Sequence, residues 1–509
     1  MKTEDKRIAK NTLFMYLRMG ITMVISLYTS RLVLQNLGVS DFGIYNVIGG
    51  LVILFSFVIN ALGASTLRFV SSALAQKNEK EITETFATIV TLYLIFSLVV
   101  VFLSETIGLS YVHNYLRFPA ERMDIVQYVF QFSMLNTVFI ILSSPFSSFL
   151  VSMEKMNVYA YLSIIDVIGK LAIVALLTVI PFDKLFIYAA FQATLAGSIL
   201  LFYLYYFKRN KFVSTFLVRL KWQKTKEILV YSSWSLYGSI AGVASTQGIN
   251  LMLNYFFGNI INAAFGISSQ VRGAITNFVS GFQVALNPQI TKSYAIHDME
   301  RHGELIGNSM KYSFILISMI GFPILFNIKE ILDLWLVEYP TQTVVFLKWS
   351  IISFIVETIS NPLSVSIAAT GRIGRYTIVI STINILTLPI SYMAIMMYDE
   401  PVVPFIVIFT MTILKMYSNM YFCRKLSDVP VYSIFRDNIL MIVKILSFSL
   451  PICYLMNYMV IGSVWYLTIC RVLIDFLLFI SVVYGFGLRT IERHWVNNKI
   501  ISIINNDKK

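Results

Sequence analysis

The stretch GISSQVRGAITNFVSGFQVALNP (Gly266–Pro288) is apolar enough to cross a bilayer, yet it carries a regular polar stripe. Six polar side chains recur at steps of three and four residues, which stacks them on one face of a helix: Ser269, Arg272, Thr276, Ser280, Gln283 and Asn287. Arg272 lies about nine residues after the expected helix start near Ala263, or ~14 Å, close to the middle of a ~30 Å hydrocarbon layer. The stripe therefore predicts a helix that faces water, protein or substrate instead of lipid.

The rest of the chain has the composition of a polytopic α-helical membrane protein. Of its 509 residues, 57% are hydrophobic and only 13% are charged, against roughly 25% charged in ordinary soluble domains. Hydropathy predicts fourteen spans, near residues 12–34, 42–66, 85–107, 124–149, 158–180, 185–207, 229–257, 263–288, 311–335, 344–369, 376–398, 402–423, 437–459 and 463–487. The first is expected to be an uncleaved helix. The longest polar connections are expected at Lys208–Glu227 and Thr291–Asn308.

Basic residues gather in alternate connections, which predicts a membrane topology with both termini in the cytoplasm. The connection after residue 207 is strongly basic, whereas the opposite set of connections holds little beyond Arg117, Arg122, Lys184 and Lys329. The net charge of +13 is therefore attributed to topology and not to a nucleic-acid-binding surface.

Two blocks of the sequence repeat at nearly the same offset. A shift of 220 residues aligns Gly38 with Gly258, and a shift of 217 aligns Pro145 with Pro362. We therefore expect two six-helix lobes, residues 1–210 and 211–430, related by a pseudo-two-fold axis along the membrane normal. Residues 431–509 would add two further transmembrane helices and a basic cytoplasmic tail. Chance similarity between hydrophobic segments is the alternative explanation.

Polar and charged side chains inside a span are costly, so each is a candidate for function. The candidates for lining a substrate-binding cavity are Arg272, Arg31, Arg18, Arg68, Asn250, Asn60, Gln283, Ser269 and Thr276. Structural alternatives remain open. Arg18 and Arg31 are roughly 140° apart around one helix and can each snorkel to an interface. Arg68 can be a solvated anchor, and small polar residues serve close helix packing equally well.

Three further charged residues are candidates for coupling transport to an ion gradient. Asp166 and Lys170 are spaced i,i+4, which is equally the spacing of a self-neutralising structural pair. Glu357 lies mid-span with no obvious partner nearby in the sequence. Lys415 is expected to snorkel towards the cytoplasmic side. In the last span, Arg471 and Asp475 form a second i,i+4 pair.

The sequence lacks the usual signatures of an enzyme. The four histidines, His113, His297, His302 and His494, are expected in loops or the tail, without the clustering that metal binding or acid–base catalysis needs. There is no glycine-rich phosphate loop, and the three cysteines fall inside apolar runs without paired spacing. We therefore expect no enzyme activity, no metal and no cofactor, apart from coupling to H⁺ or Na⁺.

Several junctions resemble those of a known family. RLVLQNLGVSDFGIYNVIGG (Arg31–Gly50) resembles the first-to-second-span junction of polysaccharide flippases in the multidrug/oligosaccharidyl-lipid/polysaccharide (MOP) exporter superfamily. STLRFVSSALAQKNEKE (Ser65–Glu81) and SMEKMNVYAYLSIID (Ser152–Asp166) resemble later junctions of the same proteins. The resemblance covers essentially the full chain, and fourteen spans suit the Wzx-type flippases of O-antigen and capsule synthesis.

This resemblance implies a MATE-like fold whose two lobes form a V around a cationic cavity, in which Arg31, Arg68 and Arg272 match basic sites. The implied substrate is an undecaprenyl-diphosphate-linked oligosaccharide: a repeat unit of lipopolysaccharide O-antigen, capsule or exopolysaccharide. It would cross the bacterial inner membrane from the cytoplasmic to the periplasmic leaflet by alternating access. The implied partners are membrane lipid, a glycan polymerase and a chain-length regulator, with a monomeric chain and no nucleic acid. The chain departs from the peptidoglycan-precursor flippase, which clusters several arginines in its first two spans.

Two rival functions stay open. A MATE-type cation-coupled drug or metabolite antiporter would need an acidic, hydrophobic cavity. A membrane glycan polymerase or ligase would need reactive residues in exoplasmic loops, where Arg117, Glu121 and Arg122 are the only charged cluster.

Overall fold

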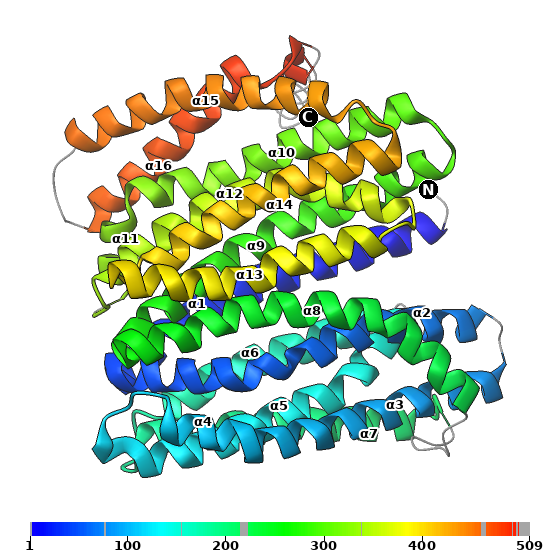
Figure 1. Ribbon diagram of the computed structural model, residues 1–509, viewed down its shortest axis with the longest axis vertical. Helices are drawn as coiled ribbons and strands as arrows, with labels where there is room; N and C mark the ends of the chain where they lie inside the picture. Colours follow the sequence, from blue (N-terminus) through cyan, green and yellow to red (C-terminus); the bar gives the residue numbers. More distant parts are fainter. Residues whose placement is uncertain are drawn as a thin grey trace, which may run out of the picture. The chain divides into compact units, whose positions relative to one another are not determined.

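The computed structural model describes residues 3–75, 78–153, 155–213, 222–336, 338–459, 465–490, 492–494 and 497. This part of the chain is mostly helical and contains no strand (Figure 1). Its α-helices are α1 (Thr3–Ile53), α2 (Phe57–Ala75), α3 (Glu79–Leu103), α4 (Leu109–Asn114), α5 (Met123–Ser152), α6 (Met156–Leu176), α7 (Lys184–Arg209), α8 (Trp222–Phe257), α9 (Asn259–Ala295), α10 (Met299–Phe326), α11 (Ile328–Trp335), α12 (Gln342–Ala369), α13 (Gly374–Tyr398), α14 (Val403–Ser427), α15 (Val431–Met459) and α16 (Trp465–Val482).

Eleven helical segments in the described residues are long and apolar enough to cross a membrane. The predicted seventh and eighth spans, α8 and α9, fall outside the eleven. Both carry the polar stripes noted in the sequence, which lower their hydropathy without shortening the helix. The first segment, Gly20–Ile53, covers most of the first predicted span and the start of the second. The chain is therefore an all-α, multi-pass membrane protein.

Two glycines break the helices at the positions that the internal repeat aligns. Gly38 interrupts α1 with φ 75° and ψ 170°, and Gly258 separates α8 from α9 with φ 82°. Glycine adopts this left-handed region without the steric cost that other residues meet there. Pro145 and Pro362, the other aligned pair, each lie inside a helix, α5 and α12. These matches support the repeat, while the boundaries of the two lobes stay a prediction.

One predicted connection differs in the structure. The polar stretch Thr291–Asn308 is mostly helical, because α9 continues to Ala295 and α10 already begins at Met299. Asp298 caps α10, since its carboxylate accepts a hydrogen bond from the backbone N–H of Arg301 at 3.1 Å. Hydropathy detects only the apolar part of a helix. The ninth span was therefore predicted to start at residue 311, 12 residues after the observed start of α10 at Met299.

The helices divide into two compact units. Unit 1 comprises Met1–Val271, Leu336–Phe346 and Gly374–Met411; unit 2 comprises Arg272–Trp335, Leu347–Ile373 and Thr412–Lys509. In unit 1, α5 packs against α7, α1 against α6, and α8 against both α2 and α13. Its core contains an aromatic cluster on α3, α5 and α7, in which the Phe207 ring lies 5.5 Å from that of Phe86 and 4.9 Å from that of Phe146.

In unit 2, the last two helices pack against α10, as Figure 1 shows for α15 and α16. Polar contacts fix α16 at the turn between α10 and α11. Arg471 lies 3.7 Å from Glu330, and the Asp475 carboxylate accepts a hydrogen bond from Asn327 at 2.7 Å. Each member of the predicted Arg471–Asp475 pair thus has a partner outside its own helix. Buried polar groups need such partners, so these contacts specify where α16 docks.

A second contact ties the segment after α16 to α10. The Lys311 ammonium, whose side chain is only 6% exposed, forms an ion pair with Glu492. The Tyr312 hydroxyl and the backbone N–H of Arg489 donate to the same carboxylate at 2.8 and 2.7 Å. Burial of Glu492 raises the pKa of its carboxyl, but these donors outweigh burial and hold that pKa below its ordinary value.

Candidate functional site

The arginine of the polar stripe forms an ion pair with the glutamate that lacked a partner in the sequence. The Arg272 guanidinium donates to the Glu357 carboxylate at 2.7 Å. It also lies 5.9 Å from the centre of the Phe354 ring, within cation–π range. Arg272 follows the start of α9 by 13 residues, or ~20 Å, so it stays deep in the helix although α9 begins earlier than expected. The side chains of Arg272 and Glu357 are 34% and 44% exposed.

Lys415 joins this pair from α14. It interacts electrostatically with both Glu357 and Arg272. We call these three residues the cationic cluster, because two cations and one carboxylate leave one net positive charge. The sequence predicts instead that Lys415 snorkels towards the cytoplasmic side. Lys415 lies 12 residues after the start of α14, or ~18 Å along the helix, which is nearly as far from the helix start as Arg272 is in α9. This depth was the feature of the sequence that could have identified Lys415 as a site residue.

A hydrogen-bonded network continues along α12 from the cluster. Gln283 donates to the Ser313 hydroxyl at 3.1 Å and to the Thr358 carbonyl at 3.2 Å, and its own carbonyl accepts from Asn361 at 2.6 Å. Gln283 is 6% exposed. The predicted stripe residue is therefore held rigidly between α9, α10 and α12, with Asn361 one helical turn from Glu357. Asn361 is not among the site residues predicted from the sequence.

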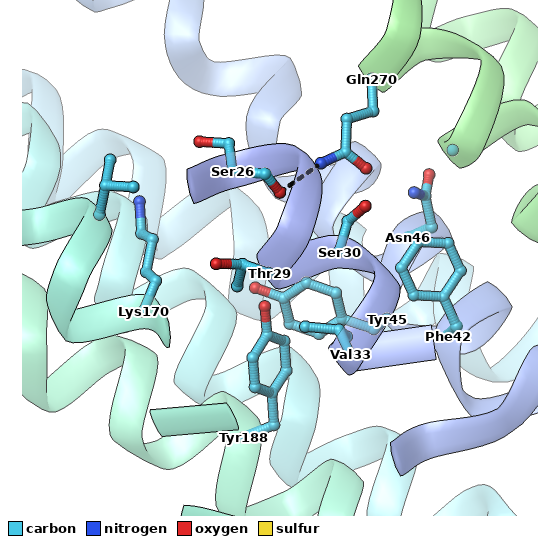
Figure 2. A pocket seen from close by; sticks show the side chains of 12 residues that line it. Ser26, Thr29, Ser30, Val33, Phe42, Tyr45, Asn46, Lys170, Tyr188 and Gln270 are labelled. Atoms are coloured by element: carbon cyan, nitrogen blue, oxygen red, sulfur yellow. Dashed lines mark hydrogen bonds between the residues drawn. The ribbon is translucent and has the colours of Figure 1, made fainter. Parts of the chain in front are cut away.

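Unit 1 contains a cavity of about 320 Å³ lined by side chains of α1, α6, α7 and α9 (Figure 2). The lining residues are Ser26, Thr29, Ser30, Val33, Phe42, Tyr45, Asn46, Val167, Lys170, Tyr188, Gly266 and Gln270. The Gln270 amide donates to the Ser26 carbonyl at 3.1 Å, the contact drawn in Figure 2. Lys170 donates to Asp166 at 2.8 Å, so the i,i+4 pair expected from the sequence is formed.

Glycine makes part of this cavity possible. A Cβ at Gly266 would collide with the side-chain amide of Asn46, which lies directly against the backbone of α9. The absence of a side chain lets α1 and α9 approach at this point and brings Asn46 to the cavity wall. Gly266 is the first residue of the polar stretch Gly266–Pro288.

The predicted Asn250 lies in a chain of amides outside the cavity lining. It is 1% exposed, its amide donates to the Asn46 carbonyl at 3.3 Å, and its carbonyl oxygen accepts from Asn262 at 2.8 Å. Asn254 donates in turn to Asn262 at 2.9 Å and accepts from the backbone N–H of Arg117. In this structure Asn250 joins α8 to α1 and α9, and its part in substrate binding stays a prediction.

The remaining predicted residues occupy varied environments. Ser269 is exposed, Arg31 is half-buried, and Thr276 returns a hydrogen bond to the Arg272 carbonyl at 2.8 Å. The side chains of Arg18, Asn60 and Arg68 lie outside the described residues, although all three positions are helical.

One expectation about the histidines was wrong. His113 lies in the helix α4 and not in a loop, and His302 is fully buried in α10. One ring nitrogen of His302 lies 2.9 Å from the Ser293 hydroxyl and the other 2.8 Å from the Ser366 hydroxyl. The polar residues around it suggested a loop, but the helix extends past the apolar part of its sequence. His302 therefore ties α9, α10 and α12 together as a structural residue.

The fold is that of transporters of the MOP superfamily. It is similar to the lipid II flippase MurJ in an inward closed conformation, with TM-score 0.64 and 13% identity over 94% of this chain and 100% of that one. It is also similar to a multidrug resistance MATE family transporter in an inward-facing conformation, with TM-score 0.65 and 12% identity over 82% and 99%. A MOP superfamily transporter from Pyrococcus furiosus matches with TM-score 0.61 and 11% identity over 84% and 96%.

The chain belongs to the family described as polysaccharide biosynthesis protein, whose model matches residues 8–294. No curated protein matches it. The resemblance found in the sequence is thereby confirmed at the level of family and fold.

Proposed function

We propose that this protein is a flippase for a lipid-linked glycan. Its substrate would be an undecaprenyl-diphosphate-linked oligosaccharide, such as an O-antigen, capsule or exopolysaccharide repeat unit. Membership of the polysaccharide biosynthesis family and a fold similar to a lipid II flippase support this function. The observation that carries the proposal is the cationic cluster, because a net positive charge deep in a membrane protein is costly and suits an anionic substrate group.

Arg272 is the residue that we assign to the diphosphate. Its guanidinium presents a planar fork that matches phosphate oxygens, whereas Lys415 would contribute a compact point charge. Glu357 acts as the resident counter-ion while the substrate is absent. A diphosphate that displaces this carboxylate keeps Arg272 neutralised, so the guanidinium need never be left unpaired in the membrane.

Glu357 is also our first candidate for ion coupling. Protonation would remove its negative charge and release Arg272 to the substrate; loss of the proton would restore the pair and expel the diphosphate. This exchange couples transport to H⁺. Asp166 and Lys170 are the second candidate pair, and coupling to Na⁺ is the alternative that ion-replacement experiments would distinguish.

The proposed setting is the bacterial inner membrane, with both termini in the cytoplasm and alternating access of two six-helix lobes, residues 1–210 and 211–430. The chain would act as a monomer beside a glycan polymerase and a chain-length regulator. The isoprenoid tail would stay in lipid, along α15 and α16.

The rival functions predict other features. A MATE-type antiporter is supported by the similar fold, but the net charge of the cationic cluster is opposite to what a cationic drug requires. A polymerase or ligase would need a free exoplasmic cluster. Arg122, one of the three charged residues predicted there, forms ion pairs with Asp41 and, at 2.5 Å, with Asp183.

The test is complementation of a strain that lacks this gene. Arg272→Ala should abolish surface display of the glycan while the protein remains in the membrane. Arg436→Ala, which removes an exposed arginine of the same unit, is the control and should complement fully. Normal display with Arg272→Ala, or drug sensitivity as the sole phenotype of the deletion, would refute the proposal.

A further inference from the structure

We propose that the cavity of unit 1 is a binding subsite for one uncharged sugar of the glycan. This inference rests on the proposed function and adds the class of sugar and the residues that recognise it. The cavity measures about 320 Å³, at the lower end of the ~300–1,000 Å³ typical of ligand pockets. That volume suits a single sugar ring and excludes a complete oligosaccharide.

The chemistry of the lining matches a sugar ring. The Ser26, Ser30, Asn46 and Gln270 side chains all belong to the wall, and amides and hydroxyls both donate and accept, as vicinal sugar hydroxyls do. Tyr45 and Tyr188 supply aromatic surface for the apolar face of the ring. Their ring centres are 4.8 Å apart in an edge-to-face arrangement, which holds that wall rigid before a ligand arrives.

Thr29 adds an unpaired polar group to the cavity wall. It is 7% exposed and its hydroxyl has no hydrogen-bond partner. Threonines in helices commonly donate back to the carbonyl four residues earlier, as Thr66, Thr88 and Thr91 do at 2.7–2.8 Å. Leaving a buried hydroxyl unsatisfied costs free energy, and Thr29 faces the cavity in the company of the other polar lining residues (Figure 2).

Charge decides which sugars fit. Among the described residues of the lining, Lys170 is the only Lys, Arg, Asp or Glu, and its ammonium is neutralised by Asp166 at 2.8 Å. The part of the lining that the structure describes therefore carries no net charge and offers no free cation to a carboxylate sugar. A uronic acid would have to break the Asp166–Lys170 pair, whereas a hexose or an N-acetylhexosamine would need only the hydroxyls and amides already in place.

The experiment measures binding to the full chain in lipid nanodiscs by native mass spectrometry. The probes are undecaprenyl diphosphate without sugar and the same lipid carrying galactose, N-acetylglucosamine or glucuronate. We expect at least one neutral sugar to improve affinity about tenfold over the bare lipid, and glucuronate to give no improvement. Thr29→Val should cut that preference about 3- to 10-fold, the value of one hydrogen bond, and leave the affinity for the bare lipid unchanged.

Two further variants complete the design. Thr29→Ser keeps the hydroxyl and should retain the preference. Thr194→Val, which removes an exposed hydroxyl bonded only to its own helix at 2.9 Å, is the matched control. Equal affinity for all four lipids, tightest binding of glucuronate, or an unchanged preference in Thr29→Val would overturn the subsite and leave the proposed function standing. No binding of any lipid would instead refute the proposed function. If Thr29→Val does not fold, the wild-type preference across the four lipids and the Thr29→Ser protein decide the question.

Discussion

Reversing the ion pair of the cationic cluster separates its structural role from its role in transport. In the double variant Arg272→Glu/Glu357→Arg, the two charges exchange positions but can still pair across the same gap between α9 and α12. The substrate, however, would meet a carboxylate where the guanidinium had been. We therefore expect the double variant to be nearly as stable as the native protein and inactive in glycan display.

The size of the stability effect follows from the geometry. At a charge separation near 4 Å, the attraction is ~4 kcal/mol at an effective dielectric of ~20 and ~1 kcal/mol in water. The two side chains are 34% and 44% exposed, so solvent screens the pair towards the lower value. We expect a coupling free energy of about 1–2 kcal/mol, equivalent to a ~5- to 30-fold change in an equilibrium constant.

The assay is a double-mutant cycle on the unfolding free energy in detergent, run beside complementation of the deletion strain. Each single reversal places two like charges together and should lose both stability and transport. Arg436 and Asp437, 3.3 Å apart and 72% and 66% exposed, form the control pair, whose reversal should give a coupling free energy near zero and normal transport. Full transport by the reversed Arg272–Glu357 pair would refute the reasoning, because the position of the guanidinium would then be irrelevant. A coupling free energy near zero would show that the pair does not contribute to stability.

Three further predictions concern the frame around the sites. The donors around Glu492 lower the pKa of its carboxyl. The stability that they confer should therefore be complete above the ordinary pKa of a glutamate and be lost as the pH falls through the lowered pKa. Glu492→Gln should cost about 1.5–3 kcal/mol of unfolding free energy at pH 7, and thermal unfolding scans should show a progressively smaller cost towards pH 4. A Cβ at Gly43 would collide with a backbone carbonyl of α9, so Gly43→Ala should destabilise the protein by about 1–3 kcal/mol. Gly49→Ala is the control, because the space around Gly49 is open. Equal melting temperatures of the two variants would contradict the close approach of α1 to α9 at Gly43. Gln283→Leu should cost about 1–3 kcal/mol for each buried partner left unsatisfied, measured as unfolding free energy; an unchanged value would mean that its network does not hold α9, α10 and α12 together.

Local sequence patterns were sufficient for the class of fold. Hydropathy located the membrane helices, because burying an apolar side chain in lipid depends on composition over some twenty residues and not on distant partners. The aligned glycines Gly38 and Gly258 both proved to be positions where a helix breaks with positive φ. The i,i+4 pair of Asp166 and Lys170 formed as its spacing predicted. Polar helix ends were the exception, since hydropathy misses a helix that continues beyond its apolar part.

The sequence by itself determined that Arg272 lies deep in a polar helix, but only the tertiary structure decided what surrounds it. Glu357 is 85 residues away along the chain, and Lys415 comes from a third helix. Neither periodicity nor hydropathy reports which helices pack together, so Glu357 had no identifiable partner and Lys415 was misassigned. The unit 1 cavity arises in the same way, from four helices whose approach depends on a glycine. Helix formation is a local property of the chain, whereas a site depends on which helix faces meet.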